Sequence, residues 1–300
     1  MKKLFERLSI IDWVNIVFWV IIFAFYVIVF TETSWRYELM VIYPALLAFV
    51  FFSAWLRERL ESWKYMKILM LVMVVIFFFS MFETLFMILP YLNPNAYDQL
   101  MVDIDHALLG VHPTLWMEQF IVPWLTEFMY ILYFFYFPMP LIALGIMYRK
   151  GMYTEMEKSM VMLLVCYYSS YITYFIVPVN GPRFYLADWH TIELTGYYLS
   201  QPIYDLIDFL ETNKYDCFPS LHTALLLVVM YLTYKYTRKL FYIYIPIAIG
   251  ILISLIYLRY HYLTDVLAGI VYAIASVWFS EWLYNKYHNK FRFHFGEKAK

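Results

Sequence analysis

The sequence predicts an all-α, polytopic membrane helix bundle with about eight transmembrane helices. Hydrophobic residues make up 64% of the 300-residue chain and charged residues 15%, whereas soluble domains contain roughly 45–50% apolar and about 25% charged residues. Mean hydropathy is +0.63, and a water-soluble globule could not bury that much apolar surface, so a bilayer must solvate it. The formal net charge of −1 provides no long-range field that would recruit nucleic acid.

Apolar runs of about 20 residues define the predicted spans. The first run follows Lys2, Lys3 and Arg7, but no small-x-small cleavage site follows it, so we interpret it as a retained span and not as a secretory signal. The short turn from Tyr236 to Lys239 makes the helices on either side antiparallel neighbours. In chain order the predicted spans are 13–30, 38–56, 67–90, 120–148, 155–177, 220–237, 240–258 and 264–284.

Basic residues set the predicted orientation, because cytoplasmic loops are rich in Lys and Arg. With eight spans, the basic clusters at both termini and after spans two, four and six all fall on one side. We therefore expect cytoplasmic termini and extracytoplasmic loops at 91–119 and 178–219, in the cytoplasmic membrane of a bacterium or archaeon. We divide the chain into an N-terminal hairpin (1–66), a six-helix core (67–284) and a basic tail (285–300).

Three polar segments fall at the predicted outer ends of the spans, although no two of them are adjacent in sequence. The bundle topology brings them to the same end. They are Asn180-Gly181-Pro182-Arg183 after span five, Phe218-Pro219-Ser220-Leu221-His222 at the start of span six, and Arg259-Tyr260-His261-Tyr262-Leu263-Thr264-Asp265 at the start of span eight.

The start of span six has the features of an anion site. Pro219 suits the first turn of a helix, where its missing N–H costs nothing. The free N–H groups of that turn and the Ser220 hydroxyl can bind an anion. His222 stands one turn further on and points toward the same anion, and Arg183 and Arg259 can neutralise phosphate oxygens.

The second histidine has a carboxylate partner. His261 and Asp265 are four residues apart and on a helix would share a face. A carboxylate in that position can hold the imidazole tautomer and stabilise the imidazolium. Together with His222 this predicts phosphoryl transfer, in which one histidine attacks phosphorus and the other protonates the leaving oxygen.

At these residues the chain resembles the type 2 phosphatidic acid phosphatase superfamily, whose motifs include Pro-Ser-x-His and a later Arg…His-x-x-x-Asp. The resemblance covers about 155–284, and the six-helix core extends it back to 67. It implies that His261 is the nucleophile and forms a phosphohistidine, that His222 is the general acid and that Asp265 orients His261. It also implies that Ser220, Arg183 and Arg259 bind phosphate, and that the reaction uses no metal or other cofactor.

Departures from the common pattern resemble one branch, the inositol phosphorylceramide synthases and their bacterial relatives. Ile176 stands where the first motif usually has lysine, Leu221 replaces a frequent glycine, and one residue instead of five separates Arg259 from His261. The segment from Asp105 to Pro113 also resembles that branch. It implies inositolphosphotransferase-like chemistry of sphingolipid metabolism, in which a phospholipid headgroup moves onto a lipid alcohol, with membrane lipids as the partners.

Two carboxylates within predicted spans are candidates for a headgroup pocket. Glu83 and Glu127 lie roughly two turns from the expected outer face, and intramembrane carboxylates are costly enough to suggest a function. Asn180 is a third candidate for this pocket. The alternative for the two glutamates is pairing with a buried partner such as tyrosine.

The sequence contains residue types that could form a metal site or a disulfide. Asp103, Asp105, His106 and His112 are ligand types, but we favour an amphipathic interfacial helix that ends at Gly110, followed by an element that starts at Pro113. Cys166 falls in an apolar run and Cys217 in a polar loop, so we expect no disulfide between them.

The rival function is a lipid transporter or scramblase without covalent chemistry. Transporters often contain inverted repeats and broken helices at the bilayer midplane. We find no repeat here, and the polar motifs cluster at one face. The sequence therefore favours an enzyme that acts on a lipid phosphate or phospholipid, with either water or a hydroxyl group as the acceptor.

Overall fold

The computed structural model describes residues 8–60, 65–210 and 215–290, and most of them are helical. Within these ranges the single β pairing is an isolated bridge between Val179 and Asp216. The all-α prediction is confirmed. Eight of the basic residues used to predict orientation lie outside the described residues, as do residues 291–300 of the predicted tail: Lys2, Lys3, Arg7, Lys64, Lys214, Arg292, Lys298 and Lys300.

Helices form at every predicted span. Six of the described helices are long and apolar enough to cross a membrane. These six are α2 (Ile10–Ile28), α3 (Arg36–Arg59), α4 (Met66–Leu85), α10 (Tyr153–Ile176), α14 (Arg238–Tyr257) and α15 (Leu263–Tyr287).

Two predicted spans differ from a simple membrane helix. The predicted span 120–148 is broken into α8 (Pro123–Phe134) and α9 (Pro138–Arg149), which are bent by 44° and together give a seventh candidate span. Pro138 is the first residue of α9 and has no backbone N–H to donate to the preceding turn, which accounts for the break. The span 220–237 is α13 (Leu221–Tyr236), with 16 residues too short for the same length test.

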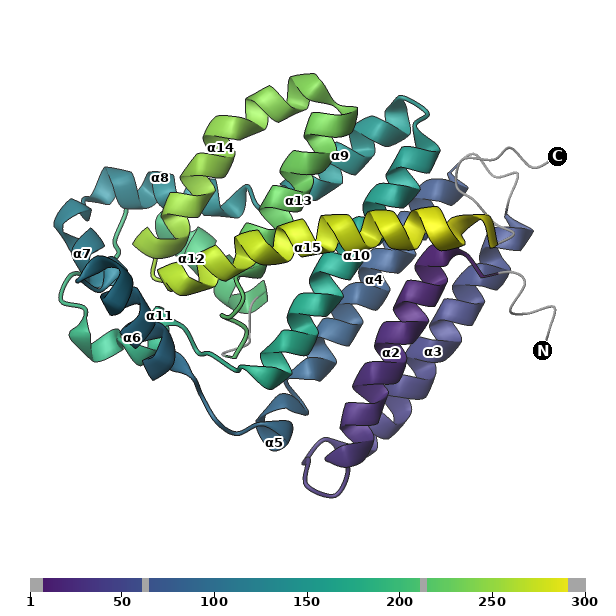
Figure 1. Ribbon diagram of the computed structural model, residues 1–300, viewed down its shortest axis with the longest axis horizontal. Helices are drawn as coiled ribbons and strands as arrows, with labels where there is room; N and C mark the ends of the chain where they lie inside the picture. The colour runs from purple at the N-terminus through teal and green to yellow at the C-terminus, as the bar shows by residue number, and fades with distance from the viewer. Residues whose placement is uncertain (1–7, 61–64, 211–214, 291–300) are drawn as a thin grey trace.

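The short helix α13 lies in the middle of the core and packs against α9, α10, α14 and α15. Figure 1 shows α15 running across the bundle beside α13 and α10. A single residue, Thr237, separates α13 from α14, so these helices are antiparallel, as the short turn predicts. This arrangement puts the start of α13 next to the start of α15, where two of the polar motifs lie.

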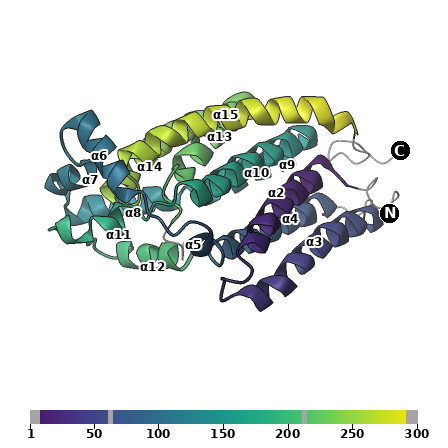
Figure 2. The ribbon, with the colours of Figure 1, turned by 60° about the horizontal axis from the view of Figure 1, so that its bottom comes forward.

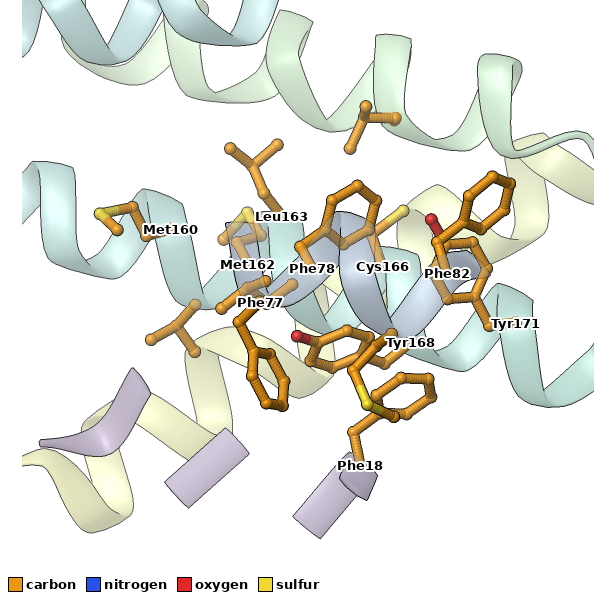
Figure 3. Packing of buried hydrophobic residues seen from close by; sticks show 14 of the residues in the cluster. Phe18, Phe77, Phe78, Phe82, Met160, Met162, Leu163, Cys166, Tyr168 and Tyr171 are labelled. Atoms are coloured by element: carbon orange, nitrogen blue, oxygen red, sulfur yellow. The ribbon is translucent and has the colours of Figure 1, made fainter. Parts of the chain in front are cut away.

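The N-terminal hairpin packs against the core on two helices, with α2 on α10 and α3 on α4. Figure 3 shows Phe18 of α2 beside Tyr168 of α10, and the two rings stack with centroids 3.9 Å apart. The Tyr168 hydroxyl donates a hydrogen bond of 2.6 Å to Oδ1 of Asn15. Within the hairpin, Arg57 and Asp12 form a buried ion pair of 2.6 Å.

Short helices gather at one end of the molecule, opposite the start of α2 and the end of α15 (Figure 2). The helix Asp98–Leu109 ends at Gly110, which adopts the left-handed conformation with φ 71°. Pro113 starts the next element, and both boundaries agree with the prediction. The short helices between the spans are α5 (Leu89–Leu92), α6 (Asp98–Leu109), α7 (Pro113–Trp116), η1 (Met117–Phe120), α11 (Pro182–Tyr185), η2 (Ala187–Trp189) and α12 (Ser200–Leu210); η3 (His288–Lys290) follows α15.

Candidate active site

His222 lies in the first turn of α13, and the residues before it fix the start of that helix. Ser220 is the N-cap, and its hydroxyl accepts a hydrogen bond of 3.2 Å from the amide of Thr223. Pro219 therefore precedes the cap and does not lie in the first turn, which corrects the sequence-based expectation. The Ser220 side chain is fully buried and acts as a helix cap in this structure.

His261 lies in the turn between α14 and α15 and not on a helix, contrary to the expectation that it shares a helical face with Asp265. Asp265 is in the first turn of α15, and its Oδ2 accepts the Tyr262 amide at 2.8 Å. The carboxylate thus turns back toward the preceding loop, and Oδ2 lies 3.5 Å from Nδ1 of His261. Capping geometry, and not helical periodicity, brings the two side chains together.

The two histidines are in direct contact. Nδ1 of His222 lies 3.0 Å from Nε2 of His261, and the ring centroids are 5.2 Å apart. The structure therefore brings together His222, His261 and Asp265 from two helix starts 39 residues or more apart in sequence. His261 and Asp265 are buried, whereas His222 is partly exposed and lies nearer the surface of the site.

Tyrosines surround His222, and sequence reasoning missed them. The Tyr133 hydroxyl of α8 lies 2.7 Å from Nε2 of His222, so both ring nitrogens of this histidine are engaged. Tyr136 packs against the same imidazole, with centroids 4.5 Å apart, and Tyr260 stacks on Tyr133 at 4.4 Å. In a chain with 31 tyrosines no sequence signal marks these three.

The two predicted arginines line one polar cavity of about 430 Å³. Nη1 of Arg183 lies 3.4 Å from a carboxylate oxygen of Asp208 on α12. Nη2 of Arg259 donates to Glu118 at 2.9 Å. Both guanidinium groups therefore face acidic partners that a phosphate would have to displace or join.

Two perturbed titratable groups lie at this cavity and outside the spans: His190, which lines it, and Glu118, which bonds to its Arg259. Burial opposes ionisation of Glu118, but hydrogen bonds from Thr191 and Ile192 and the charge of Arg259 outweigh it and lower the pKa of that carboxyl. Burial, together with the charge of Arg259, lowers the pKa of His190 to about 4. At neutral pH the cavity therefore contains a neutral His190 beside the Arg259–Glu118 ion pair.

A second cavity, of about 350 Å³, is apolar and lies among α4, α9 and α10. It and the polar cavity are arranged along α8 and the turn that follows. Tyr130 lines the polar cavity, Tyr133 contacts His222, and Tyr136 lines the apolar cavity. The segment of α8 that contacts His222 therefore lies between the polar and the apolar cavity. Helix α12 also lines both cavities, with Tyr204 in the polar one and Leu206 in the apolar one.

Two aspartates of α6 position the loops that form the site. Asp98 accepts hydrogen bonds from the amides of Asn180 and Gly181, both at 2.9 Å. Asp105 accepts the amides of Leu263 and Thr264 at 2.9 and 2.8 Å and thereby caps the start of α15. The sequence suggested metal-ligand chemistry or an interfacial helix for Asp105, and the structure shows a helix cap.

The three headgroup-pocket candidates lie apart from one another. Glu83 is exposed on α4. Glu127 of α8 accepts hydrogen bonds from the amides of residues 197–200, with 3.0 Å to Tyr197 and 3.1 Å to Ser200, and so anchors the start of α12. Asn180 is tied to Asp98 through its backbone and its side chain. None of the three lines the polar cavity.

One group of side chains has the composition of a metal site. Among the described residues, the ligand atoms of Cys217, His261 and Asp265 lie within 4.8 Å of one another. Sγ of Cys217 and Oδ2 of Asp265 are already joined at 2.9 Å, so we treat the group as hydrogen-bonded. Cys217 and Cys166 are both free thiols, as predicted.

Comparison with known proteins gives one match. A model described as the PAP2 superfamily matches residues 99–279, more than half of the chain. The matched region contains both histidines, Asp265 and both arginines of the polar cavity. No curated protein and no solved structure matches the chain.

Proposed function

The chain belongs to the PAP2 superfamily, and from that premise we propose that it transfers the phosphoryl group of a membrane lipid through a phosphohistidine on His261. Family membership supports a phosphatase-type activity on a lipid or other phosphate substrate. The contact of 3.0 Å between Nε2 of His261 and Nδ1 of His222 carries the proposal, because a nucleophile and a proton donor must approach the same phosphorus atom.

The chemistry assigns each group one task. Nε2 of His261 attacks phosphorus, a P–N bond forms, and the P–O bond to the leaving group breaks while His222 donates a proton to the leaving oxygen. The acceptor then loses a proton to His222 as its oxygen attacks phosphorus and the P–N bond breaks. Asp265, 3.5 Å from Nδ1, stabilises the cation that develops on His261. The two ring nitrogens are too close for phosphorus to lie between them, so substrate binding must move His222 aside.

The arginines and Ser220 complete the proposed phosphate site. Arg183 and Arg259 line the same polar cavity and offer charge-assisted donors to phosphate oxygens. Ser220 is two residues before His222, but its hydroxyl caps α13. Its phosphate contact therefore requires the hydroxyl to accept from Thr223 while donating to substrate.

Headgroup transfer is the favoured outcome within this proposal. A terminal phosphate needs only water beyond the phosphorus, whereas a phospholipid headgroup needs a polar chamber there. The polar cavity of about 430 Å³ and the apolar cavity of about 350 Å³ share the walls of α8 and α12, which suits a lipid with polar groups beyond its phosphorus. By the distribution of basic residues we place this site on the extracytoplasmic face.

The test of the covalent step is a labelling experiment. Purified protein is incubated with ³²P-labelled phosphatidic acid, diphosphate lipids and headgroup-bearing phospholipids, the reaction is quenched, and the acid-labile label is mapped. We expect the adduct on His261, none in His261→Ala, and turnover lowered by several orders of magnitude in that variant. His106→Ala, at an exposed histidine of α6, is the matched control and should be unaffected. An adduct on another residue would refute the assignment.

A second assay separates hydrolysis from transfer. Headgroup-labelled phospholipids are supplied with and without lipid alcohols; inorganic phosphate signals hydrolysis and a new phospholipid signals transfer. In parallel, a vesicle assay follows lipid flux in wild type and in His261→Ala. Flux that survives this substitution, with no turnover in the wild type, would identify a transporter and not an enzyme.

A further inference from the structure

Cys217 is a buried thiol in contact with two of the three catalytic candidates. Its Sγ lies 2.9 Å from Oδ2 of Asp265 and 3.3 Å from Nδ1 of His261. A third contact, of 3.2 Å, is with the carbonyl oxygen of Tyr260. The residue is 4% exposed, and its amide donates to the Val179 carbonyl at 3.1 Å, so the backbone holds the thiol in place.

The thiol acts as a donor here and not as a nucleophile. Burial raises the pKa of Cys217 well above its usual value, and the neighbouring Asp265 charge raises it further. The group therefore stays protonated at neutral pH, and an S–H group has one proton to give. The shortest of its three contacts is to the carboxylate oxygen of Asp265, which is the strongest acceptor among them.

That oxygen is the one nearest His261. Oδ2 of Asp265 also accepts the Tyr262 amide, while Oδ1 is buried and makes no hydrogen bond to the described residues. The distance of 3.5 Å from Oδ2 to Nδ1 of His261 exceeds that of a good hydrogen bond. The thiol therefore shares the carboxylate with the imidazole and packs against the edge of the ring that carries Nδ1.

We propose that Cys217 is a positioning residue of the reaction. Through Asp265 it sets how strongly the carboxylate holds the His261 imidazolium, and by packing against Nδ1 it keeps Nε2 directed at His222. The inference rests on the proposed function of His261 as the nucleophile.

Gly181 of the first motif makes room for this thiol. A Cβ built on Gly181 would lie 3.1 Å from Sγ of Cys217 and 3.3 Å from the Tyr260 carbonyl oxygen. Its φ of 96° is also one that residues with a side chain rarely adopt. The Asn180-Gly181-Pro182 segment therefore has a steric task at the site besides presenting Arg183.

The test compares Cys217→Ala and Cys217→Ser with Cys166→Ala, which removes the other buried thiol of the chain. Turnover of the lipid that the labelling assay shows to be a substrate is measured against pH, with kcat and KM separated and thermal unfolding recorded. Without the S–H donor, the negative charge of Asp265 is less compensated and stabilises the His261 imidazolium more strongly. The imidazolium is not nucleophilic. In Cys217→Ala the acid limb of kcat/KM should therefore move to higher pH, with kcat about tenfold lower below neutral pH and KM unchanged.

The serine variant tests the donor itself. Its O–H can give a hydrogen bond to Asp265, so Cys217→Ser should return the acid limb toward that of the wild type. Cys166→Ala should leave the limb unmoved. The proposal is overturned if the acid limb of kcat/KM lies at the same pH in Cys217→Ala and in Cys166→Ala, with or without loss of thermal stability. If Cys217→Ala does not fold, the proposal is overturned when the acid limb of Cys217→Ser is displaced from that of the wild type by a full pH unit. Retained turnover in His261→Ala would instead refute the proposed function.

Discussion

At the scale of single residues, Tyr133 fixes the ring of His222. Its hydroxyl lies 2.7 Å from Nε2, and Nδ1 of the same ring contacts His261. A histidine with partners on both nitrogens has a defined ring orientation. The imidazole of the proposed proton donor His222 is therefore held by a residue outside every motif in the sequence.

Tyr133→Phe should lower kcat about two- to tenfold, the equivalent of one hydrogen bond, with little change in KM. The physical reason is the loss of the hydroxyl partner while the ring that stacks on Tyr260 stays. Steady-state kinetics check this. The matched control is Tyr136→Phe, which keeps the ring packed against His222; equal losses in both variants would contradict the role of the Tyr133 hydroxyl.

The lowered pKa of His190 predicts that the stability of the fold depends on pH. Its folded-state pKa of about 4 lies below the ordinary value of 6.5, so the unfolded chain binds more protons between these values and stability falls as pH is lowered through that window. The thermal unfolding midpoint of the detergent-solubilised protein should therefore drop from pH 7 to pH 4.5. His190→Asn should reduce this drop, and His106→Asn should not.

A further drop below pH 4.5, the ordinary pKa of a glutamate, should persist in His190→Asn. The pKa of Glu118 is lowered in the folded state, so protonation of this carboxyl at acid pH also favours the unfolded chain. A pH dependence that is the same in the wild type and in His190→Asn would contradict the assignment to His190.

At the scale of elements, α6 determines where α15 begins. Asp105 accepts two amides and the Thr264 hydroxyl at the first turn of α15, and Asp265 is in that turn. A negative charge there also complements the partial positive charge of the helix start. The position of Asp265 thus depends on a carboxylate from a different helix.

Asp105→Asn should cost about 1–2 kcal/mol of stability, as expected for loss of a charged cap, and should lower kcat by displacing Asp265. Differential scanning calorimetry and kinetics on the same preparation measure both effects. Asp103→Asn is the control, because Asp103 is exposed on the same helix and is bonded by Gln99. Full activity in Asp105→Asn would contradict a positioning role.

Glu127 of α8 fixes the start of α12 in a similar way. One carboxylate accepts the amides around the start of α12, and α12 forms a wall of both cavities. Glu127→Gln removes the charge that these amides face. We expect a higher KM for the lipid substrate and a smaller change in kcat, because the cavity walls loosen while the histidines stay in place.

At the scale of the whole molecule, the N-terminal hairpin is attached to the core by specific aromatic packing. Phe18 is 2% exposed and stacks on Tyr168 of α10. Phe18→Ala should lower stability by about 3 kcal/mol through the cavity left behind without moving KM. The control is Phe52→Ala on α3, where the ring is 49% exposed. A change in KM equal to that of Glu127→Gln would contradict the separation of hairpin and site.

The sequence by itself determined the all-α membrane class. It also named His222, His261 and Asp265, which the structure brings together. Composition and runs of apolar residues are local properties, and they decide by themselves whether a helix can span a bilayer. The spacing of motif residues is likewise visible in the sequence without knowledge of the fold. It did not determine the break between α8 and α9 in detail, or that His261 lies off the helix.

Only the tertiary structure decided what surrounds the histidines. Tyr133, Asp105 and Cys217 come from segments far from their partners in sequence, and each resembles many other tyrosines, aspartates or loop residues of the chain. Their contacts depend on how α6, α8 and α13 pack, and packing is set by the sum of many weak apolar contacts that no local pattern specifies.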